Sequence, residues 1–415
     1  MHSSKKIKLC KIESIAFAKY CIDMGVDLLG VHVLNSAIDA NIRLLVDYIQ
    51  EHGGNTVILT KEHDPDVIKK MMDYYRPSYV QLHSPIAASA LTSLRGSLSV
   101  DVIPVITDET KASDARQIID SSNLVIYDSS YTGGTGQPNK QQLVAHLSQE
   151  QLDKVLLAGG VTPMTVQDTD NTVFGGYDVQ SYTRTNKRHS YARASRIIEA
   201  IKGHPTGMVD VSLTDAINVP VGSYENIPGL HGFHLDYSVG NLYQELKVDV
   251  SYIENTVRLL DAPFTVHIFE SSLSNYQKVI DHLMLLAENN IVCINIQYFP
   301  GLDIDAIQTY DAKKCISIYY KDITEYIKQR SPYDECLSII LPSENPRKLK
   351  AIKEYSDFLI GIRDLEVWFD RRVDTFTVNE VLRVDRSANF IAGKFIIYDW
   401  SNLQTINTII HDTHV

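Results

Sequence analysis

Residues 28–60, LLGVHVLNSAIDANIRLLVDYIQEHGGNTVILT, contain the repeating unit that decides the fold. Both ends of this stretch, 28–33 and 56–60, are short β-branched runs of the length of buried strands. Between them four apolar residues recur at three- and four-residue spacing: Ile38, Ile42, Leu45 and Ile49. This spacing predicts a helix over 37–50 with one apolar stripe. The stretch therefore predicts a strand, a helix and a second strand, as in α/β proteins with parallel sheets.

Runs of the same kind recur along the whole chain. In the first half they lie at 6–13, 28–33, 56–60, 79–83, 100–106, 123–128, 155–161 and 176–181. In the second half they lie at 208–213, 231–237, 264–269, 292–298, 314–320, 336–341, 358–363 and 389–397. Eight strands, each followed by a helix, is the count of a closed (β/α)8 barrel. The sequence therefore predicts an α/β protein of two tandem (β/α)8 TIM barrels, in residues 1–203 and 207–415. The alternative is a doubly wound open sheet, which has the same alternation.

Composition and charge exclude several classes of protein. The chain has 415 residues, with 39 Lys and Arg against 51 Asp and Glu, which gives a net charge of −12. An acidic chain is a poor partner for nucleic acid or an anionic membrane. No apolar run is long enough to span a bilayer, and the polar start resembles no signal peptide. The five scattered cysteines are typical of reduced thiols. We therefore expect a cytoplasmic protein without nucleic-acid or membrane partners.

Reactive residues of an α/β barrel lie at the carboxyl ends of its strands. Cys10 ends the first predicted strand and Asp128 ends the sixth. A thiol and a carboxyl group across a barrel mouth could serve as base and acid on one substrate. Glycines after late strands let backbone N–H groups approach a phosphate. The glycines in such positions are Gly134, Gly136, Gly159 and Gly160, which are therefore candidate phosphate-binding residues.

Several segments of the first half, taken in order, resemble phosphoribosylanthranilate isomerase. They are KLCKI, GVHV, VQLHS, YDSSYTGGTG, LLAGGVTP and YDVQS. That family converts an aminoaldose phosphate into an aminoketose phosphate by an Amadori rearrangement. The resemblance implies that Cys10 is the general base at the sugar C2 and that Asp128 is the acid that opens the furanose ring. It also implies that Gly159, Gly160 and Ser181 help to hold the phosphate of a small phosphorylated sugar substrate.

The first half departs from the family at two places. Lys11 follows Cys10 where the family usually has glycine, and the loop 34–38 lacks the arginine that grips the anthranilate carboxylate. A buried carboxylate without a paired cation is costly, so we expect a substrate other than anthranilate. His83 is expected to be a structural residue. His32 interrupts an apolar strand and could face the barrel mouth.

The second half offers candidate metal ligands. His234 and Asp236 lie two residues apart on one predicted strand and so point the same way, and His267 lies on the next strand. Two imidazoles and a carboxylate suit Zn²⁺, Mn²⁺, Co²⁺ or Fe²⁺. We therefore expect a divalent metal in this half.

This arrangement resembles ribulose-phosphate 3-epimerase, although less closely. The resemblance implies a fourth ligand from the seventh strand, for which Asp364 is the first candidate and Asp385 the second. It also implies that Asp236 and Asp364 act as acid and base, while the metal stabilises an enediolate.

The two resemblances together predict a cytoplasmic sugar-phosphate isomerase fused to a metal-dependent epimerase-like barrel. The alternative is a binding or scaffold protein in which one barrel is catalytically dead.

Overall fold

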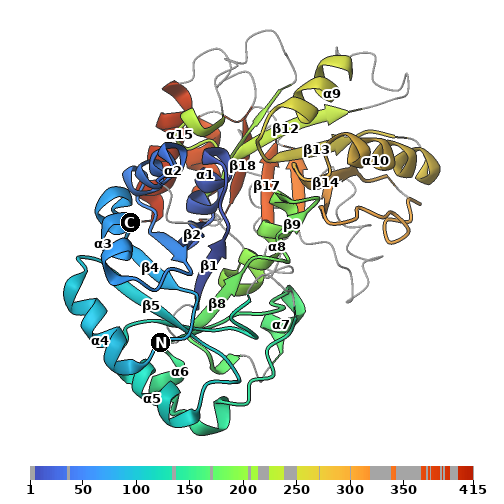
Figure 1. The fold of residues 1–415 in the computed structure, drawn as a ribbon. Helices are drawn as coiled ribbons and strands as arrows, with labels where there is room; N and C mark the ends of the chain where they lie inside the picture. Colours follow the sequence, from blue (N-terminus) through green and yellow to red (C-terminus); the bar gives the residue numbers. More distant parts are fainter. Residues whose placement is uncertain are drawn as a thin grey trace. The chain divides into compact units, whose positions relative to one another are not determined.

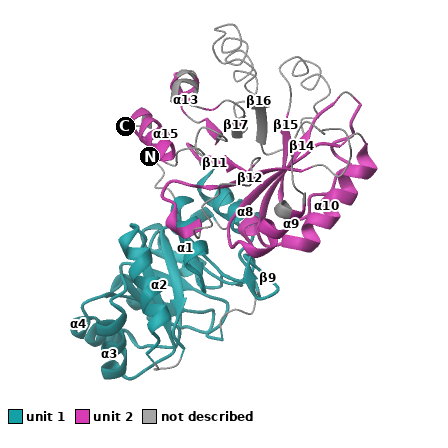
Figure 2. Ribbon diagram, turned by 90° about the horizontal axis from the view of Figure 1, so that it is seen from above, with its two compact units in different colours: residues 1–189, 194–203 teal, residues 190–193, 204–415 magenta. Residues whose placement is uncertain are grey.

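The computed structural model describes residues 5–414 except 35–37, 133–136, 169–171, 204–206, 214–223, 238–249, 271, 300, 318–337, 343–365, 371–372, 374, 384–385, 387 and 393–400. The chain divides into two compact units, which Figure 2 shows in different colours. Unit 1 contains residues 1–189 and 194–203, and unit 2 contains residues 190–193 and 204–415.

Unit 1 is built on eight parallel strands that pair in chain order. The ring closes because the last strand, β8, also pairs with β1 in parallel, with Lys8 opposite Asp178. The strands are β1 Lys6–Cys10, β2 Leu28–His32, β3 Thr56–Thr60, β4 Tyr79–Leu82, β5 Asp101–Ile106, β6 Val125–Tyr127, β7 Val155–Leu157 and β8 Gly176–Val179. The expected TIM barrel of the first half is therefore confirmed.

Helices alternate with these strands and lie outside the ring (Figure 1). They are α1 Ile15–Asp23, α2 Ala40–Glu51, α3 Pro65–Tyr75, α4 Ala88–Ser97, α5 Ala112–Asp120, α6 Gln149–Leu152, α7 Pro163–Gln167 and α8 Tyr191–Lys202. Local capping decides where several of them begin, because an N-cap side chain accepts a hydrogen bond from an otherwise unpaired backbone N–H group. Ser14 caps α1 in this way and Asp39 caps α2, so α2 begins at Ala40 rather than at residue 37.

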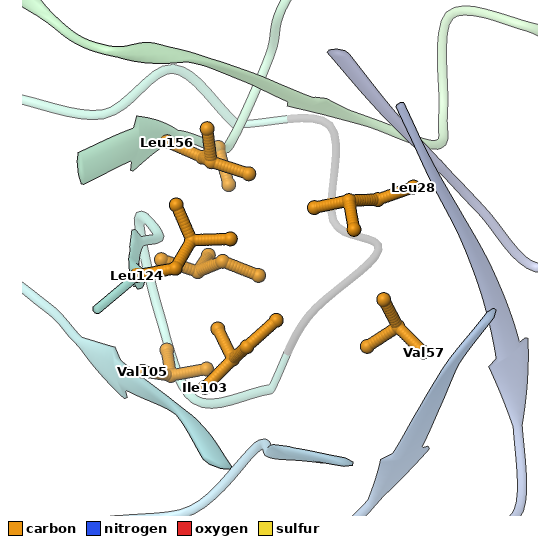
Figure 3. Packing of buried hydrophobic residues seen from close by; sticks show 8 residues of the cluster. Leu28, Val57, Ile103, Val105, Leu124 and Leu156 are labelled. Carbon is orange, nitrogen blue, oxygen red and sulfur yellow. The ribbon is translucent and has the colours of Figure 1, made fainter. Parts of the chain in front are cut away.

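A cluster of apolar side chains fills part of the interior of the first barrel. Its buried members come from five strands and the segments beside them: Leu28, Val57, Ile103, Val105, Leu124, Ile126, Leu156 and Ala158. Figure 3 shows the labelled members pointing toward one another across the space between the strands. The barrel therefore has a packed core, over which the polar residues at the strand ends can be held in fixed positions.

Unit 2 also contains eight parallel strands, and they pair in chain order from β11 to β18, with β18 pairing back to β11. The strands are β11 Val209–Ser212, β12 Gly232–Tyr237, β13 Phe264–Ile268, β14 Ile291–Gln297, β15 Lys313–Ser317, β16 Ser338–Pro342, β17 Glu366–Asp370 and β18 Asn389–Ala392. The α-helices that the structure describes between or after them are α9 Val250–Leu259, α10 Leu273–Ala287, α13 Thr375–Leu382 and α15 Ser401–His414. The described part of unit 2 thus contains parallel strands paired in chain order with a partial helical layer, and a complete second (β/α)8 barrel stays a prediction.

The seventh strand of unit 2 was predicted at the wrong place. It is β17, Glu366–Asp370, which pairs with β16 from Ser338↔Glu366 to Pro342↔Asp370. The more apolar run 358–363 suggested a strand, and it lies outside the described residues. Acidic residues at both ends of EVWFD hide the strand pattern, although its central Trp368 is buried. Asp364, expected just after the seventh strand, instead precedes it in the chain.

Within the described residues, no helix has both the length and the apolar character needed to cross a membrane.

Replacing Ile103 by alanine should test the barrel core. Its side chain is fully buried in the apolar cluster, so the change should lower the free energy of unfolding by about 2–5 kcal/mol. Urea unfolding followed by circular dichroism measures this loss. The matched control is Leu44→Ala on α2, where 62% of the side chain is exposed, and it should change stability by less than about 0.5 kcal/mol. Equal losses for the two variants would show that the cluster is not a stabilising core.

Candidate active site

A cavity of about 250 Å³ lies at the carboxyl ends of the strands of unit 1. It is lined by residues that end or follow β1, β2, β3, β4, β6, β7 and β8. Five residues expected in the site line it together: Cys10, Asp128, Gly159, Gly160 and Ser181. Gly134 and Gly136 lie outside the described residues.

A buried ion pair lies next to the cavity, which its acidic member Asp178 lines. Sequence reasoning missed this pair. Lys8 is fully buried, and its Nζ donates to both carboxylate oxygens of Asp178 at 2.9 Å. Burial disfavours the charged ammonium, but Asp178 and Cys10 more than offset this and raise the pKa of Lys8. Lys8 is therefore an ammonium at neutral pH. A lysine between Ile7 and Leu9 in a strand was the available signal, because a buried lysine needs a partner.

The sulfur of Cys10 contacts two nitrogen-bearing side chains. Lys8 Nζ lies 3.2 Å from Cys10 Sγ, and His32 Nε2 lies 3.2 Å from the same atom. Burial raises the pKa of Cys10 to about 11, although the positive charge of Lys8 opposes the shift. The residue is therefore a thiol at neutral pH, and a nearby ammonium stabilises its thiolate when that forms.

The two histidines of the cavity are neutral at physiological pH. Burial and then the positive charge of Lys8 lower the pKa of His32 to about 3. Burial also lowers the pKa of His83 to about 4, and its Nδ1 lies 3.3 Å from Gln81 Nε2. Neither histidine therefore adds positive charge to the cavity, although each can exchange hydrogen bonds.

Asp128 has the properties of an acid. It follows β6 at the cavity wall, and its Oδ1 accepts a hydrogen bond of 3.2 Å from Ser129 Oγ. Burial raises the pKa of Asp128 more than hydrogen bonds from Ser129 and Ser130 lower it. A raised pKa keeps a larger fraction of the carboxyl group protonated, which is the form that donates a proton.

Two glycines after β7 bring the backbone close to neighbouring loops. Gly159 has a φ of +85° and Gly160 a φ of +63°, in the left-handed region that favours glycine. A Cβ on Gly159 would lie 2.9 Å from Ser129 Oγ, and one on Gly160 would lie 2.9 Å from the Cα of Pro138. Glycine is therefore required at both positions for this wall of the cavity to keep its shape.

Two lysines line the cavity, although the loop after β2 carries no cation. They are Lys11, which follows β1, and Lys61, which follows β3 and donates to the Thr132 carbonyl at 3.1 Å. Lys11 has a φ of +68°, so it occupies the left-handed conformation for which the family's glycine is suited. Positive charge for an anionic substrate is thus available from strands β1 and β3.

The basic stretch 184–189 forms a small hairpin of β9 Arg184–Thr185 and β10 Arg188–His189. Arg184 Nη1 donates to Glu13 Oε2 at 2.9 Å, and His189 Nε2 lies 2.8 Å from the Lys11 carbonyl oxygen. The hairpin therefore supports the backbone of Lys11, a role that the sequence did not reveal.

In unit 2, His234, Asp236 and His267 have ligand atoms that lie within 4.8 Å of one another. The two imidazole rings are buried, with centroids 5.6 Å apart, and His267 Nδ1 lies 3.3 Å from Asp236 Oδ1. Neither ring nitrogen of His234 has a hydrogen-bond partner among the described residues. The three predicted ligands are thus brought together, whereas Asp364 and Asp385 lie outside the described residues.

Sequence reasoning missed Asn295 beside this cluster. On β14 it pairs with His267, and His267 pairs with Asp236 on β12. Paired residues of parallel strands point to the same face, so the three side chains form one row. Asn295 is fully buried, and its amide oxygen and nitrogen have no hydrogen-bond partner in the described part of the chain.

The closed ring of unit 1, with polar residues converging over the carboxyl ends of its strands, is the architecture of a TIM-barrel enzyme. Residues 7–186 match the family model of N-(5'phosphoribosyl)anthranilate (PRA) isomerase. The N-terminal half is therefore similar to PRA isomerase, and the protein is an enzyme of the isomerase type. The match ends at residue 186, so the expected likeness of the second half to ribulose-phosphate 3-epimerase stays a prediction.

Curated relatives match the same half. An N-(5'-phosphoribosyl)anthranilate isomerase of Natronomonas pharaonis is 27% identical over 169 residues, which cover 39% of this chain and 80% of the relative. One of Bacillus cereus is 28% identical over 174 residues, covering 40% of this chain and 83% of the relative. The crystal structure of phosphoribosyl anthranilate isomerase from Thermotoga maritima aligns with a TM-score of 0.40 at 17% identity, over 48% of this chain and 100% of that chain.

These matches correct the expectation that the substrate is not anthranilate-linked. The family and the relatives are named for phosphoribosyl anthranilate. The expectation assumed that the carboxylate needs a cation from the loop after β2. That assumption was too narrow, because Lys11 and Lys61 line the same cavity from other strands.

The raised pKa of Cys10 can be measured by alkylation with iodoacetamide, followed by mass spectrometry of the Cys10 peptide. Only the thiolate reacts. With a pKa of about 11, the rate in the folded protein should rise about tenfold per pH unit up to about pH 10. In the urea-denatured chain the rate should level off near about pH 9. If the alkylation rate in the folded protein also levelled off near about pH 9, this would contradict the raised pKa of Cys10. The absolute rate does not matter for this test.

Proposed function

We propose that the N-terminal barrel isomerises phosphoribosyl anthranilate, an aminoaldose phosphate, to the corresponding aminoketose phosphate. The observation that carries this proposal is that Cys10 and Asp128 line one cavity within a domain that matches PRA isomerase. The reaction needs a base at C2 of the sugar and an acid at the ring oxygen, and no external oxidant or reductant. A thiol and a carboxyl group supply both roles.

In this proposal Asp128 protonates the furanose ring oxygen, and the C1–O bond breaks to give an open-chain iminium. The thiolate of Cys10 then removes the proton from C2, and the electron pair neutralises the iminium as an enolamine. The enolamine tautomerises to the ketone. The raised pKa of Asp128 supports its part as acid, and the ammonium of Lys8 at 3.2 Å supports the thiolate of Cys10.

The substrate carries a phosphate and a carboxylate, and we assign them to different parts of the cavity. Gly159, Gly160 and Ser181 follow β7 and β8 and suit the phosphate, because glycine backbone N–H groups can approach it closely. Lys61 follows β3 and supplies a cation for the carboxylate.

Replacing Cys10 by alanine should lower kcat for phosphoribosyl anthranilate by about 10²–10⁴-fold, since the base is lost. Asp128→Asn should give a loss of similar size, because an amide cannot donate the proton. Turnover is measured by following formation of the aminoketose. The matched control is Cys21→Ala on α1, a buried cysteine that does not line the cavity, and it should keep kcat within about twofold. Full activity of Cys10→Ala would refute the mechanism.

For the second half we propose a separate (β/α)8 domain, with domains of residues 1–203 and 207–415. We also propose that this domain binds one divalent metal, Zn²⁺, Mn²⁺, Co²⁺ or Fe²⁺, through His234, Asp236 and His267. The donor set fits such an ion, because imidazole and carboxylate are its usual ligands. The fully buried His234, without hydrogen-bond partners among the described residues, also supports it. A bound metal would supply Lewis-acid chemistry at this position.

The metal proposal predicts stoichiometric binding of Zn²⁺ or Co²⁺ by the full chain, measured by elemental analysis after dialysis. His234→Asn should reduce the bound metal to well below about one equivalent, and should abolish the rise in melting temperature that the metal produces. His282→Asn on α10 is the matched control, because His282 is exposed, contacts Glu254 and is not one of the three clustered ligands. Equal metal content in the two variants would exclude this site.

A further inference from the structure

Asn295 places a buried amide beside the proposed metal ligands of unit 2. It lies on β14 opposite His267 on β13, and His267 lies opposite Asp236 on β12. Paired residues of parallel strands point to the same face, and neighbouring strands are about 4.8 Å apart. Asn295 therefore lies one strand away from His267, on the face of the sheet that carries all three proposed ligands.

The residues on both sides of Asn295 fix its side chain on this face. Ile294 and Ile296 are fully buried, and they pair with Val266 and Ile268 of β13. Side chains alternate between the two faces of a strand, so these four residues form an apolar face opposite the polar one. A shift of register by one residue would exchange the two faces. The amide is therefore held toward the proposed metal ligands by the packing of its neighbours.

The hydrogen-bonding groups of this amide are unused. Asn295 is fully buried, and neither its Oδ1 nor its Nδ2 has a hydrogen-bond partner in the described part of the chain. Gln297, two residues further along the same strand, shows the contrast, because its Nε2 donates to the Ser317 carbonyl oxygen at 3.1 Å. Burying an amide without a partner lowers the stability of a fold. An apolar residue at position 295 would avoid this cost, so the amide points to a ligand that uses it.

The chemistry of the neighbouring side chains indicates what this ligand is. The ligand atoms of His234, Asp236 and His267 lie within 4.8 Å of one another, and the amide of Asn295 makes no hydrogen bond to His267. An amide does not ionise, so its oxygen adds a donor atom to the group without adding charge. Carbonyl and carboxylate oxygens and imidazole nitrogens are all common ligands of divalent metals.

We propose that Oδ1 of Asn295 is a fourth protein ligand of a divalent metal held by His234, Asp236 and His267. This inference rests on the metal site proposed above for unit 2. The donor set then consists of two imidazole nitrogens, one carboxylate oxygen and one amide oxygen. Binding of the metal gives the buried amide oxygen its missing partner, so metal binding and the stability of this part of the sheet are coupled.

Asn295→Leu tests the proposal, because leucine keeps the approximate size of the side chain and removes the amide. The affinity of the full chain for Co²⁺, titrated in competition with a chelator, should fall by at least about tenfold. The visible absorption of bound Co²⁺ should also change, because it depends on the number and kind of ligands.

The melting temperature of the metal-free chain separates a ligand from a structural residue. The metal-free Asn295→Leu variant should melt at the wild-type temperature or above it, since an apolar side chain replaces an unpaired buried amide. An asparagine that only stabilises the fold would instead give a lower melting temperature without metal.

Asn295→Asp is the rescue variant. It keeps an oxygen atom at the same place and adds a negative charge, so it should bind Co²⁺ at least as tightly as the wild-type chain. If Asn295→Leu fails to fold, this variant still decides, because a folded aspartate variant that has lost Co²⁺ binding would contradict an oxygen ligand at this position.

Gln297→Leu is the matched control, since it removes a buried amide from the same face of the same strand. The amide nitrogen of Gln297 already has a partner, so the opposite pattern is expected. This variant should bind Co²⁺ as tightly as the wild-type chain, and its metal-free form should melt at a lower temperature because hydrogen bonds are lost.

Wild-type Co²⁺ affinity and absorption in Asn295→Leu would overturn the proposal. The variant His234→Asn shows which proposal has failed. If it loses Co²⁺ while Asn295→Leu does not, the site with three ligands stands and only the fourth ligand is wrong. A wild-type chain that binds no Co²⁺ would refute the metal site itself, and the role of Asn295 with it.

Discussion

The candidate active site of the first barrel depends on one buried ion pair, between Lys8 on β1 and Asp178 on β8. These two strands are the first and the last of the ring, and they pair with Lys8 opposite Asp178. The ion pair therefore forms only when the barrel closes. Removing one partner would leave an uncompensated buried charge, which costs about 3–5 kcal/mol. The same ammonium contacts Cys10. The positive charge that stabilises the thiolate of Cys10 is therefore fixed in place when the barrel closes.

Much of the fold could be predicted from local patterns. Every predicted strand of the first half overlaps an observed one, because β-branched runs between amphipathic helices are a local signal. Cys10 and Asp128 were predicted together, since residues at the carboxyl ends of strands share one face of a barrel. The pairing of Lys8 with Asp178 was not predicted, because it joins residues 170 positions apart. Its geometry depends on the register of the closed ring, which no short stretch of sequence encodes.

In the second half, too, local sequence patterns predicted some features, whereas features that depend on strand pairing were missed. The row of Asp236, His267 and Asn295 follows from strand register. Asp236 was predicted from the local HxD spacing with His234, and His267 was predicted because it lies on the next strand. Asn295 gave no such signal, since an asparagine in an apolar strand has no characteristic spacing. The seventh strand was misplaced because hydrophobicity favoured 358–363 over EVWFD, whereas pairing with β16 defines the observed strand.

The left-handed backbone conformation of Lys11 lowers folding stability, whereas its side chain adds positive charge that attracts an anionic ligand. A side chain with a Cβ costs about 1–2 kcal/mol in that conformation relative to glycine, and the β9–β10 hairpin holds the backbone there through His189. Glycine would relax the backbone but would take a positive charge away from the cavity wall. This position therefore exchanges folding stability for electrostatic attraction of an anionic ligand, and the concentration of salt sets how much that attraction is worth.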